Sequence, residues 1–126
     1  MNIYVRSSTK IEVSGLRDAA GGDDIEDATV TATLFRHAEL WGYYDAYESW
    51  VESGEQGDEP AKPAPVLPAL PLPHAGEGRY LATWPAADTA RLSRSVPYAV
   101  EVVADAGGDV IVKPVDAAAR FAPAGA

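Results

Sequence analysis

The sequence predicts an all-β protein, an antiparallel sandwich of two sheets with about seven short strands. Apolar and polar residues alternate with a period of two in several short runs that are rich in valine, isoleucine and threonine. Glycine, proline and aspartate separate these runs and supply turns. Strands and helices do not alternate along the chain, so the pattern does not predict a parallel sheet.

The length of 126 residues suits a single domain. We place this domain at residues 1–116, with an insert and a proline-rich connector at 36–75. Residues 117–126 are small and include proline and glycine, so we expect them to form a loose C-terminal tail.

The first elements are strands. Ile3 and Val5 share one side of the opening strand, and Ile11 and Val13 share one side of the next. The segment 18–24, rich in glycine and aspartate, predicts a turn.

The clearest strand is Ala28–Phe35. Its alanine, valine and leucine residues alternate with three threonines. Because threonine tolerates a solvated sheet, we expect one face of this strand in the core and one outside.

An aromatic insert follows, and it is the most distinctive part of the chain. More than half of the three tryptophans and six tyrosines are in this one stretch. Its members are Trp41, Tyr43, Tyr44, Tyr47 and Trp50.

The apolar spacing in this insert favours a helix. Leu40, Tyr44, Tyr47 and Val51 recur every three or four residues, which predicts a helix over about 38–52. The alternative is a pair of strands, since tyrosine and tryptophan also favour sheets.

The connector at 60–73 contains six prolines. This density excludes a helix or a central strand and predicts an extended segment along a sheet edge. A ligand for an aromatic-lined groove is the alternative interpretation.

The last third returns to strands. Residues 78–85 and 96–104 read as strands, with one helical turn between them in 86–95. A tight turn with two glycines leads to a returning strand at 110–115, in which Pro114 marks the end or an edge position.

A local feature refines the fold. Leu92 precedes Tyr98 by six residues, and Tyr98 begins an alternating strand. The segment 92–98 resembles the tyrosine corner of immunoglobulin-like (Ig-like) sandwiches. In that corner the tyrosine hydroxyl bonds to the backbone just upstream, and the leucine fills the core. The predicted class is therefore an Ig-like antiparallel β-sandwich. An ordinary aromatic residue at the edge of the core is the alternative interpretation of Tyr98.

The resemblance extends to small Ig-like proteins of tailed bacteriophages and prophages. It covers residues 1–35 and 76–115, and the insert departs from it. It implies a structural or accessory component of a virion that works through protein contacts. The segments that carry it are Ile3-Tyr-Val-Arg6, Ala28-Thr-Val-Thr-Ala-Thr-Leu34, Gly78-Arg-Tyr80 with Trp84-Pro85, and Tyr98-Ala-Val-Glu-Val102.

The composition excludes several classes of function. The net charge of −9 disfavours nucleic acid and anionic membranes, because both repel an acidic surface. The absence of cysteine excludes disulfides and thiolate metal sites. The start of the chain lacks the features of a signal peptide, so we expect synthesis in the cytoplasm, with later association with a virion.

Catalytic chemistry is not expected. His37 and His74 are the two histidines, and neither accompanies a nucleophile elbow, so a small hydrolase ranks last among the hypotheses. We expect no metal and no cofactor. The acidic stretches 23–27 and 52–59 predict solvated loops, with calcium binding as the alternative.

The aromatic insert is the candidate contact surface, because tyrosine and tryptophan dominate binding hot spots. Partners would be other virion subunits or a second copy of the chain. Sugar binding by a cellular surface module is the alternative function. Packing of the aromatic stripe on its own sandwich is the favoured interpretation over an interface.

Overall fold

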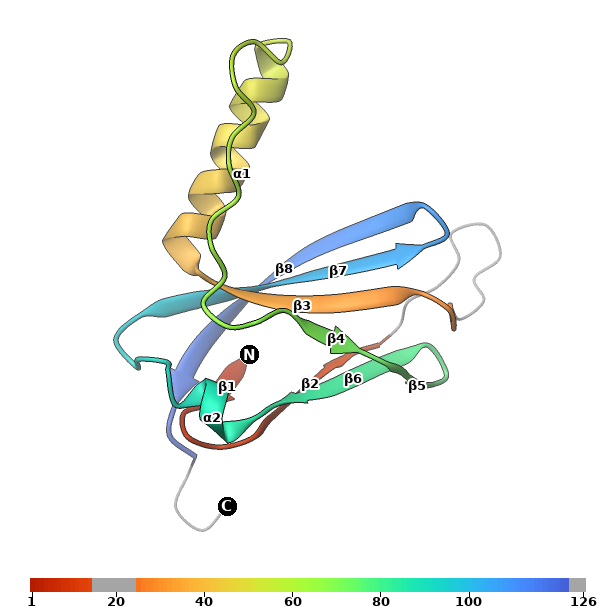
Figure 1. Ribbon diagram of the computed structural model, residues 1–126, viewed down its shortest axis with the longest axis vertical. Coiled ribbons are helices and arrows are strands. Elements are labelled where there is room, and N and C mark those ends of the chain that lie inside the picture. The colour runs from red at the N-terminus through yellow and green to blue at the C-terminus, as the bar shows by residue number, and fades with distance from the viewer. Residues whose placement is uncertain (15–24, 123–126) are drawn as a thin grey trace.

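The computed structural model describes residues 1–14 and 25–122. In these residues two sheets form the two layers of the molecule, and one long helix projects from them (Figure 1). The all-β prediction is confirmed. The elements are β1 (Asn2–Tyr4), β2 (Thr9–Val13), β3 (Thr29–Arg36), α1 (His37–Glu52), β4 (Leu70–Leu72), β5 (His74–Gly76), β6 (Arg79–Trp84), α2 (Ala86–Thr89), β7 (Pro97–Ala106) and β8 (Asp109–Arg120).

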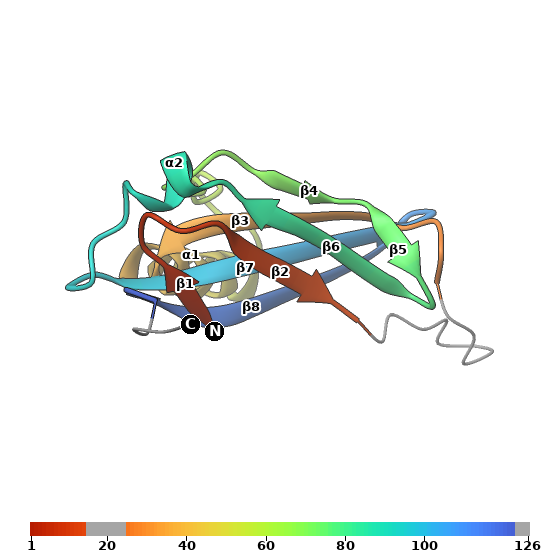
Figure 2. The ribbon, with the colours of Figure 1, turned by 90° about the horizontal axis from the view of Figure 1, so that it is seen from below.

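The larger sheet has five strands in the order β1-β8-β7-β3-β4, and the smaller has three in the order β2-β6-β5. Figure 2 shows β2 and β6 in front of the larger sheet. Among the strand pairs of the described residues, β1 with β8 alone is parallel. The expectation of a purely antiparallel sandwich is wrong at this pair.

Strands β1 and β2 follow each other in the chain but belong to different sheets. A turn separates them, in which the Ser7 amide donates to the Tyr4 carbonyl at 3.1 Å and Arg6 has a φ of 61°. The hydroxyl of Thr9 accepts the Tyr4 amide hydrogen at 3.0 Å. The turn thus directs the chain from one layer to the other.

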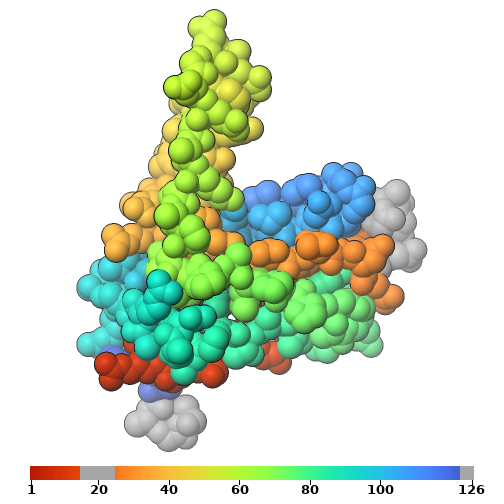
Figure 3. Space-filling view, in the orientation of Figure 1, coloured from red at the N-terminus to blue at the C-terminus, as the bar shows by residue number. Residues whose placement is uncertain are grey.

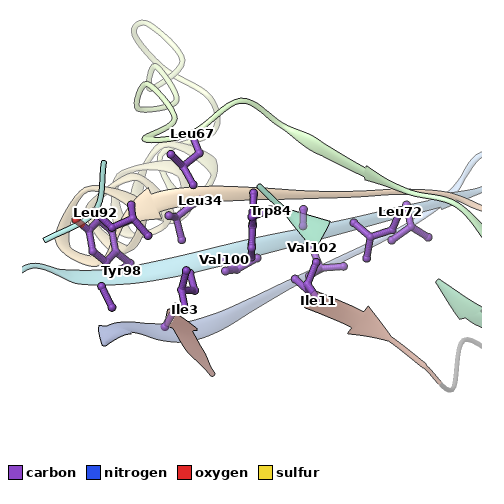
Figure 4. Packing of buried hydrophobic residues seen from close by; sticks show 14 of the residues in the cluster. Ile3, Ile11, Leu34, Leu67, Leu72, Trp84, Leu92, Tyr98, Val100 and Val102 are labelled. Atoms are coloured by element: carbon purple, nitrogen blue, oxygen red, sulfur yellow. The ribbon is translucent and has the colours of Figure 1, made fainter. Parts of the chain in front are cut away.

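The core lies between the two sheets and follows the predicted alternation. On β3, Val30, Ala32 and Leu34 are buried, while the three threonines point outward and are exposed or half-buried. Trp84 of β6 packs between the layers near Val100 of β7 (Figure 4). Removing these side chains from water is the main source of folding free energy.

The predicted corner has the expected hydrogen bond. The hydroxyl of Tyr98 accepts the Ser93 amide hydrogen at 2.9 Å. Tyr98 and Leu92 are both buried and lie side by side in the core (Figure 4). The bond satisfies a backbone donor just upstream of β7.

The end of the chain differs from the predicted tail. Strand β8 continues past Pro114 to Arg120, and Ala117 and Ala119 are buried. Pro114 is tolerated because β1 pairs with residues 118–120, and within the described residues no strand pairs with Pro114 on that side. The pairing with β1 explains why residues 117–120 are ordered strand and not tail.

Helix α1 begins directly after β3 and confirms the helical prediction for the insert. Its end has the hydrogen bonds of a Schellman motif, in which the Gly54 amide donates to the Val51 carbonyl and the Glu55 amide to the Trp50 carbonyl. Gly54 has a φ of 79°, which glycine adopts without strain. The sequence Ser-Gly after the aromatic stripe therefore ends the helix.

The proline-rich connector returns the chain to the large sheet, as expected for an edge segment. The Val66 amide donates to the Leu34 carbonyl at 2.8 Å, and Leu67 and Leu72 are buried. Strand β4 then pairs with β3, with Pro71 opposite Thr31. An edge strand tolerates proline because one row of its backbone groups has no partner strand. The predicted turn at 18–24 lies outside the described residues.

Candidate functional site

Helix α1 and the segment that returns beside it project from the outer face of the five-stranded sheet. We call residues 37–65 the arm; Figures 1 and 3 show it rising from the body of the sandwich. The indole N–H of Trp50 donates to the Gly57 carbonyl at 3.2 Å, which ties the returning segment to the helix. The arm therefore presents a helix face toward the outer face of the sheet.

The base of the arm is packed on the sheet. Leu40 is fully buried and forms a small cluster with Phe35 of β3 and Ala99 of β7, against which Tyr44 is packed. His37 lies 3.2 Å from a carboxylate oxygen of Asp116 on β8. These contacts fix the direction in which α1 leaves the sheet.

A buried carboxylate reinforces this junction. Glu101 of β7 is 3% exposed although it points to the outer face of the sheet. The Tyr44 hydroxyl donates to Glu101 Oε2 at 2.5 Å, and Lys62 of the returning segment forms an ion pair with Oε1. A buried charge needs such partners, because desolvation without them costs several kcal/mol.

The environment of Tyr44 changes its acidity. Burial, together with the hydrogen bond to Glu101 and the negative charge of that carboxylate, raises the pKa of the Tyr44 hydroxyl well above its ordinary value. All three causes disfavour the phenolate, which would be desolvated, could not donate a hydrogen bond to Glu101 and would repel its charge. Tyr44 therefore stays a hydrogen-bond donor throughout the neutral and mildly alkaline range.

An open groove lies between the arm and the outer face of the sheet, with a volume of about 590 Å³. Its lining is mainly aromatic and aliphatic, and three of these apolar residues are markedly exposed: Tyr47 at 38%, Val51 at 46% and Val112 at 51%. The groove is bounded by Tyr43, Tyr44, Tyr47, Glu48, Val51 and Glu52 of α1, Lys62 of the returning segment, Glu101 and Val103 of β7, and Val112 of β8.

Charge surrounds this apolar surface. Within residues 37–62 the chain carries seven carboxylates and a single lysine. Glu48 and Glu52 line the groove directly, whereas Lys62 is paired with Glu101 at its base. The groove therefore combines tyrosine rings and valine side chains with an excess of negative charge.

The five aromatic residues predicted as a contact surface have three different positions. Tyr43, Tyr44 and Tyr47 line the groove. Trp41 is 39% exposed and packs edge-on against Tyr44, with ring centroids 5.4 Å apart. Trp50 contacts Tyr47 at 5.6 Å and holds the returning segment, so it stiffens the arm.

Sequence reasoning did not identify the sheet side of the groove. Val103 and Val112 are directly opposite each other on the outer face, one on β7 and one on β8. The alternation of β7 places Val103 on the same face as Glu101, and this pattern was visible in the sequence. What no local pattern indicated is that the insert folds over that face.

The two histidines do not form a common site. His37 is beside Asp116 near the large sheet, and His74 is on β5 of the small sheet, 5.2 Å from the Tyr80 ring. Within residues 1–14 and 25–122, no group of three or more histidine and carboxylate side chains is arranged to hold a metal ion.

Comparisons with models of protein families, with curated proteins and with solved structures found no match to this chain. Among the residues that the structure describes, no helix is long and apolar enough to span a membrane.

Proposed function

We propose that the chain is a non-catalytic Ig-like module that serves as a structural or accessory component of a phage or prophage particle. It acts through protein–protein contacts at the groove between the arm and the five-stranded sheet. After synthesis in the cytoplasm it associates with the particle. We assign the groove as the contact surface because its lining is apolar and exposed, although the arm is otherwise acidic.

The strand order supports the Ig-like part of the proposal. Variable-type immunoglobulin sheets contain neighbouring strands G, F, C and C′ in one layer and B, E and D in the other. The orders β8-β7-β3-β4 and β2-β6-β5 correspond to these two sets. Tyr98 at the start of β7 then occupies the corner before strand F.

Two departures separate this chain from antibody domains. It has no cysteine, and its buried tryptophan, Trp84, is on β6 instead of strand C. Neither is needed for the Ig-like arrangement, which many cell-surface domains share without these features. The arm occupies the connection between the strands that correspond to C and C′.

The chemistry of the groove supports a protein partner. Exposed tyrosine and valine side chains on a rigid frame bury apolar area at a low cost in side-chain entropy. The frame is rigid because Leu40 is buried at the base of the arm and the Trp50 indole is hydrogen-bonded to the returning segment. Carboxylates at the rim select partners with basic groups through complementary charge.

A particle-association experiment tests the proposal. The gene is deleted from the bacterium that carries it and complemented with the native chain or with Tyr47→Ala/Val51→Ser. Particles are purified, and the protein is quantified in them by immunoblot. The native chain is expected in the particles, and the variant is expected to be reduced at least about tenfold.

A matched control uses an exposed aliphatic residue outside the groove. Ile111 is 46% exposed, as is Val51, but it does not line the groove. Ile111→Ser should leave particle association unchanged. Absence of the native chain from every particle fraction would reject a virion role, and equal loss in both variants would reject the groove as the contact surface.

Sugar binding is a second candidate that one observation favours. Tyr43 and Tyr47 are neighbours in the groove, with ring centroids 6.0 Å apart, and Glu48 and Glu52 lie beside them. Aromatic faces next to carboxylates suit stacking on a sugar together with hydrogen bonds to its hydroxyls. A glycan array would show binding that Tyr47→Ala abolishes; an array without signal for the native chain excludes this alternative.

A further inference from the structure

Charge is unevenly distributed over the molecule. The arm carries seven carboxylates against one lysine within residues 37–62. Four exposed arginines, by contrast, are carried by the β1–β2 turn, the loop between α2 and β7, and the end of β8. They are Arg6, Arg91, Arg94 and Arg120. This second region, which we call the basic end, has an opposite charge to the arm.

The basic end contains a hollow of its own. Arg94 and Arg120 line an open depression of about 570 Å³ together with Phe121, which is 54% exposed. The guanidinium of Arg94 lies over the Phe121 ring, 5.0 Å from its centroid. The basic end therefore offers cations and an exposed aromatic ring on one surface.

Two further arginines belong to the same region. The buried hydroxyl of Thr89 in α2 donates to the Ser7 carbonyl at 2.9 Å, which joins the β1–β2 turn to α2. Arg6 immediately precedes Ser7, and Arg91 follows Thr89 by two residues. The hydrogen bond thus holds both residues at the end of the molecule where α2 and β1 meet.

The arm and the basic end are on opposite sides of the sandwich. In Figure 1, α1 rises at the top of the molecule, whereas α2, β1 and the end of β8 lie toward the bottom. A molecule with complementary surfaces on opposite sides can bind a second copy of itself in the same orientation, and a third copy can follow.

We propose that this chain self-associates head to tail, with the basic end of one copy docked in the groove of the next. The inference rests on the proposed function, because it takes the groove as the contact surface and names a second copy as its occupant. Arg94 and Arg120 meet Glu48 and Glu52, and Phe121 packs on Val51 and Val112.

The chemistry of the two surfaces is matched in kind. A guanidinium binds carboxylates in a bidentate manner and stacks on aromatic faces, and the groove provides both groups in Glu48, Glu52, Tyr43 and Tyr47. Phe121 exposes apolar area that the valines of the groove would cover. Each surface therefore satisfies groups that its own molecule leaves exposed.

A two-fold dimer through the groove is disfavoured by the same charges. In such an interface the same patch meets itself, so each arm would face the carboxylates of the other. Like charges across an interface cost several kcal/mol. The head-to-tail arrangement avoids this repulsion and replaces it with attraction.

Two complementary variants test the arrangement. One variant, Glu48→Arg/Glu52→Arg, reverses the charge of the groove. The other, Arg94→Glu/Arg120→Glu, reverses the charge of the basic end. Control variants reverse exposed charges elsewhere, with Glu39→Arg on the arm and Lys10→Glu on β2. Circular dichroism and melting temperature establish that each variant is folded, and Arg94→Gln/Arg120→Gln replaces the second variant if it is not.

Sedimentation velocity over a concentration series measures the assembly. The native chain is expected to form species larger than a dimer, and each reversed variant alone is expected to bind itself at least about tenfold more weakly. Mixing the two variants is expected to restore association, because the intact groove of one variant meets the intact basic end of the other, and the two reversed surfaces also carry opposite charges.

The outcomes separate the alternatives. A native chain that is monomeric at every concentration overturns the inference. Association that neither variant weakens, or that mixing does not restore, overturns the head-to-tail arrangement in favour of another interface. A monomeric chain that still requires Tyr47 and Val51 for particle association would reject self-assembly and leave the proposed function standing.

Discussion

At the level of single residues, the hydroxyls of Tyr98 and Tyr44 have structural roles. That of Tyr98 accepts the Ser93 amide hydrogen in the core, at the beginning of β7. That of Tyr44 donates to Glu101 on the opposite face of the same sheet. The first was predictable from the spacing to Leu92, whereas the second depends on a contact between residues far apart in the sequence.

Removal of the Tyr98 hydroxyl tests the corner. In Tyr98→Phe the Ser93 amide loses its partner, and the free energy of unfolding should fall by about 1–2 kcal/mol. Urea denaturation measures the change. Tyr43→Phe, which removes a hydroxyl from the groove instead, should alter stability by less than about 0.5 kcal/mol. Equal effects in the two variants would contradict a special role for Tyr98.

The raised pKa of Tyr44 predicts a dependence on alkaline pH. In the unfolded chain its pKa is the ordinary value of about 10, and the folded protein keeps the proton to a higher pH. The native state then binds more protons than the unfolded state, so the stability contributed by Tyr44 is complete below pH ~10 and is lost as pH rises further.

The measurement compares the native chain with Tyr44→Phe in urea titrations at increasing alkaline pH. The stability difference between them should shrink once the pH passes the ordinary tyrosine pKa. A difference that stays constant across this range would show that the Tyr44 proton is not linked to folding.

Helix α1 combines two environments at the level of the element. Its base is core, since Leu40 is buried, and its outer half is surface, since Tyr47 and Val51 are exposed. The periodicity of the stripe predicted the helix correctly. It did not predict where the helix leaves the sheet, because that direction depends on Glu101, Lys62 and Asp116, which are distant in the sequence.

Paired truncations separate these environments. Leu40→Ala leaves a cavity at the base and should lower the free energy of unfolding by about 2–4 kcal/mol. Val51→Ala removes an exposed side chain and should change it by less than about 0.5 kcal/mol. Thermal unfolding followed by circular dichroism gives both values. A large effect of Val51→Ala would mean that the whole stripe is core.

At the level of the whole molecule, the two ends of the described chain are joined in the five-stranded sheet. Strand β1 pairs with the end of β8, with Ile3 opposite Ala119. Local patterns predicted most strands, because alternation is a property of neighbouring residues. The parallel pair was missed because its partners are more than a hundred positions apart, and the three alanines at 117–119 resemble a tail when read alone.

Two shortened chains test this pairing. A chain that ends at Arg120 retains all of β8 and should keep its melting temperature within a few degrees. A chain that ends at Asp116 loses the partner of β1 and the buried Ala117 and Ala119, so it should be strongly destabilised or unfolded. Differential scanning calorimetry compares them, and similar melting temperatures would contradict a structural role for residues 117–120.

The positions at which the arm joins the sandwich have a consequence for how such a chain can change over time. The arm departs from β3 and returns to its neighbour β4, and the Val66 amide already bonds to the Leu34 carbonyl where the two meet. An inserted segment whose two ends are held together by the sheet can be lengthened, shortened or exchanged at a small cost in loop-closure entropy. The connection between β3 and β4 can thus accept inserts of different length and sequence, while the core sequence of the sandwich stays the same.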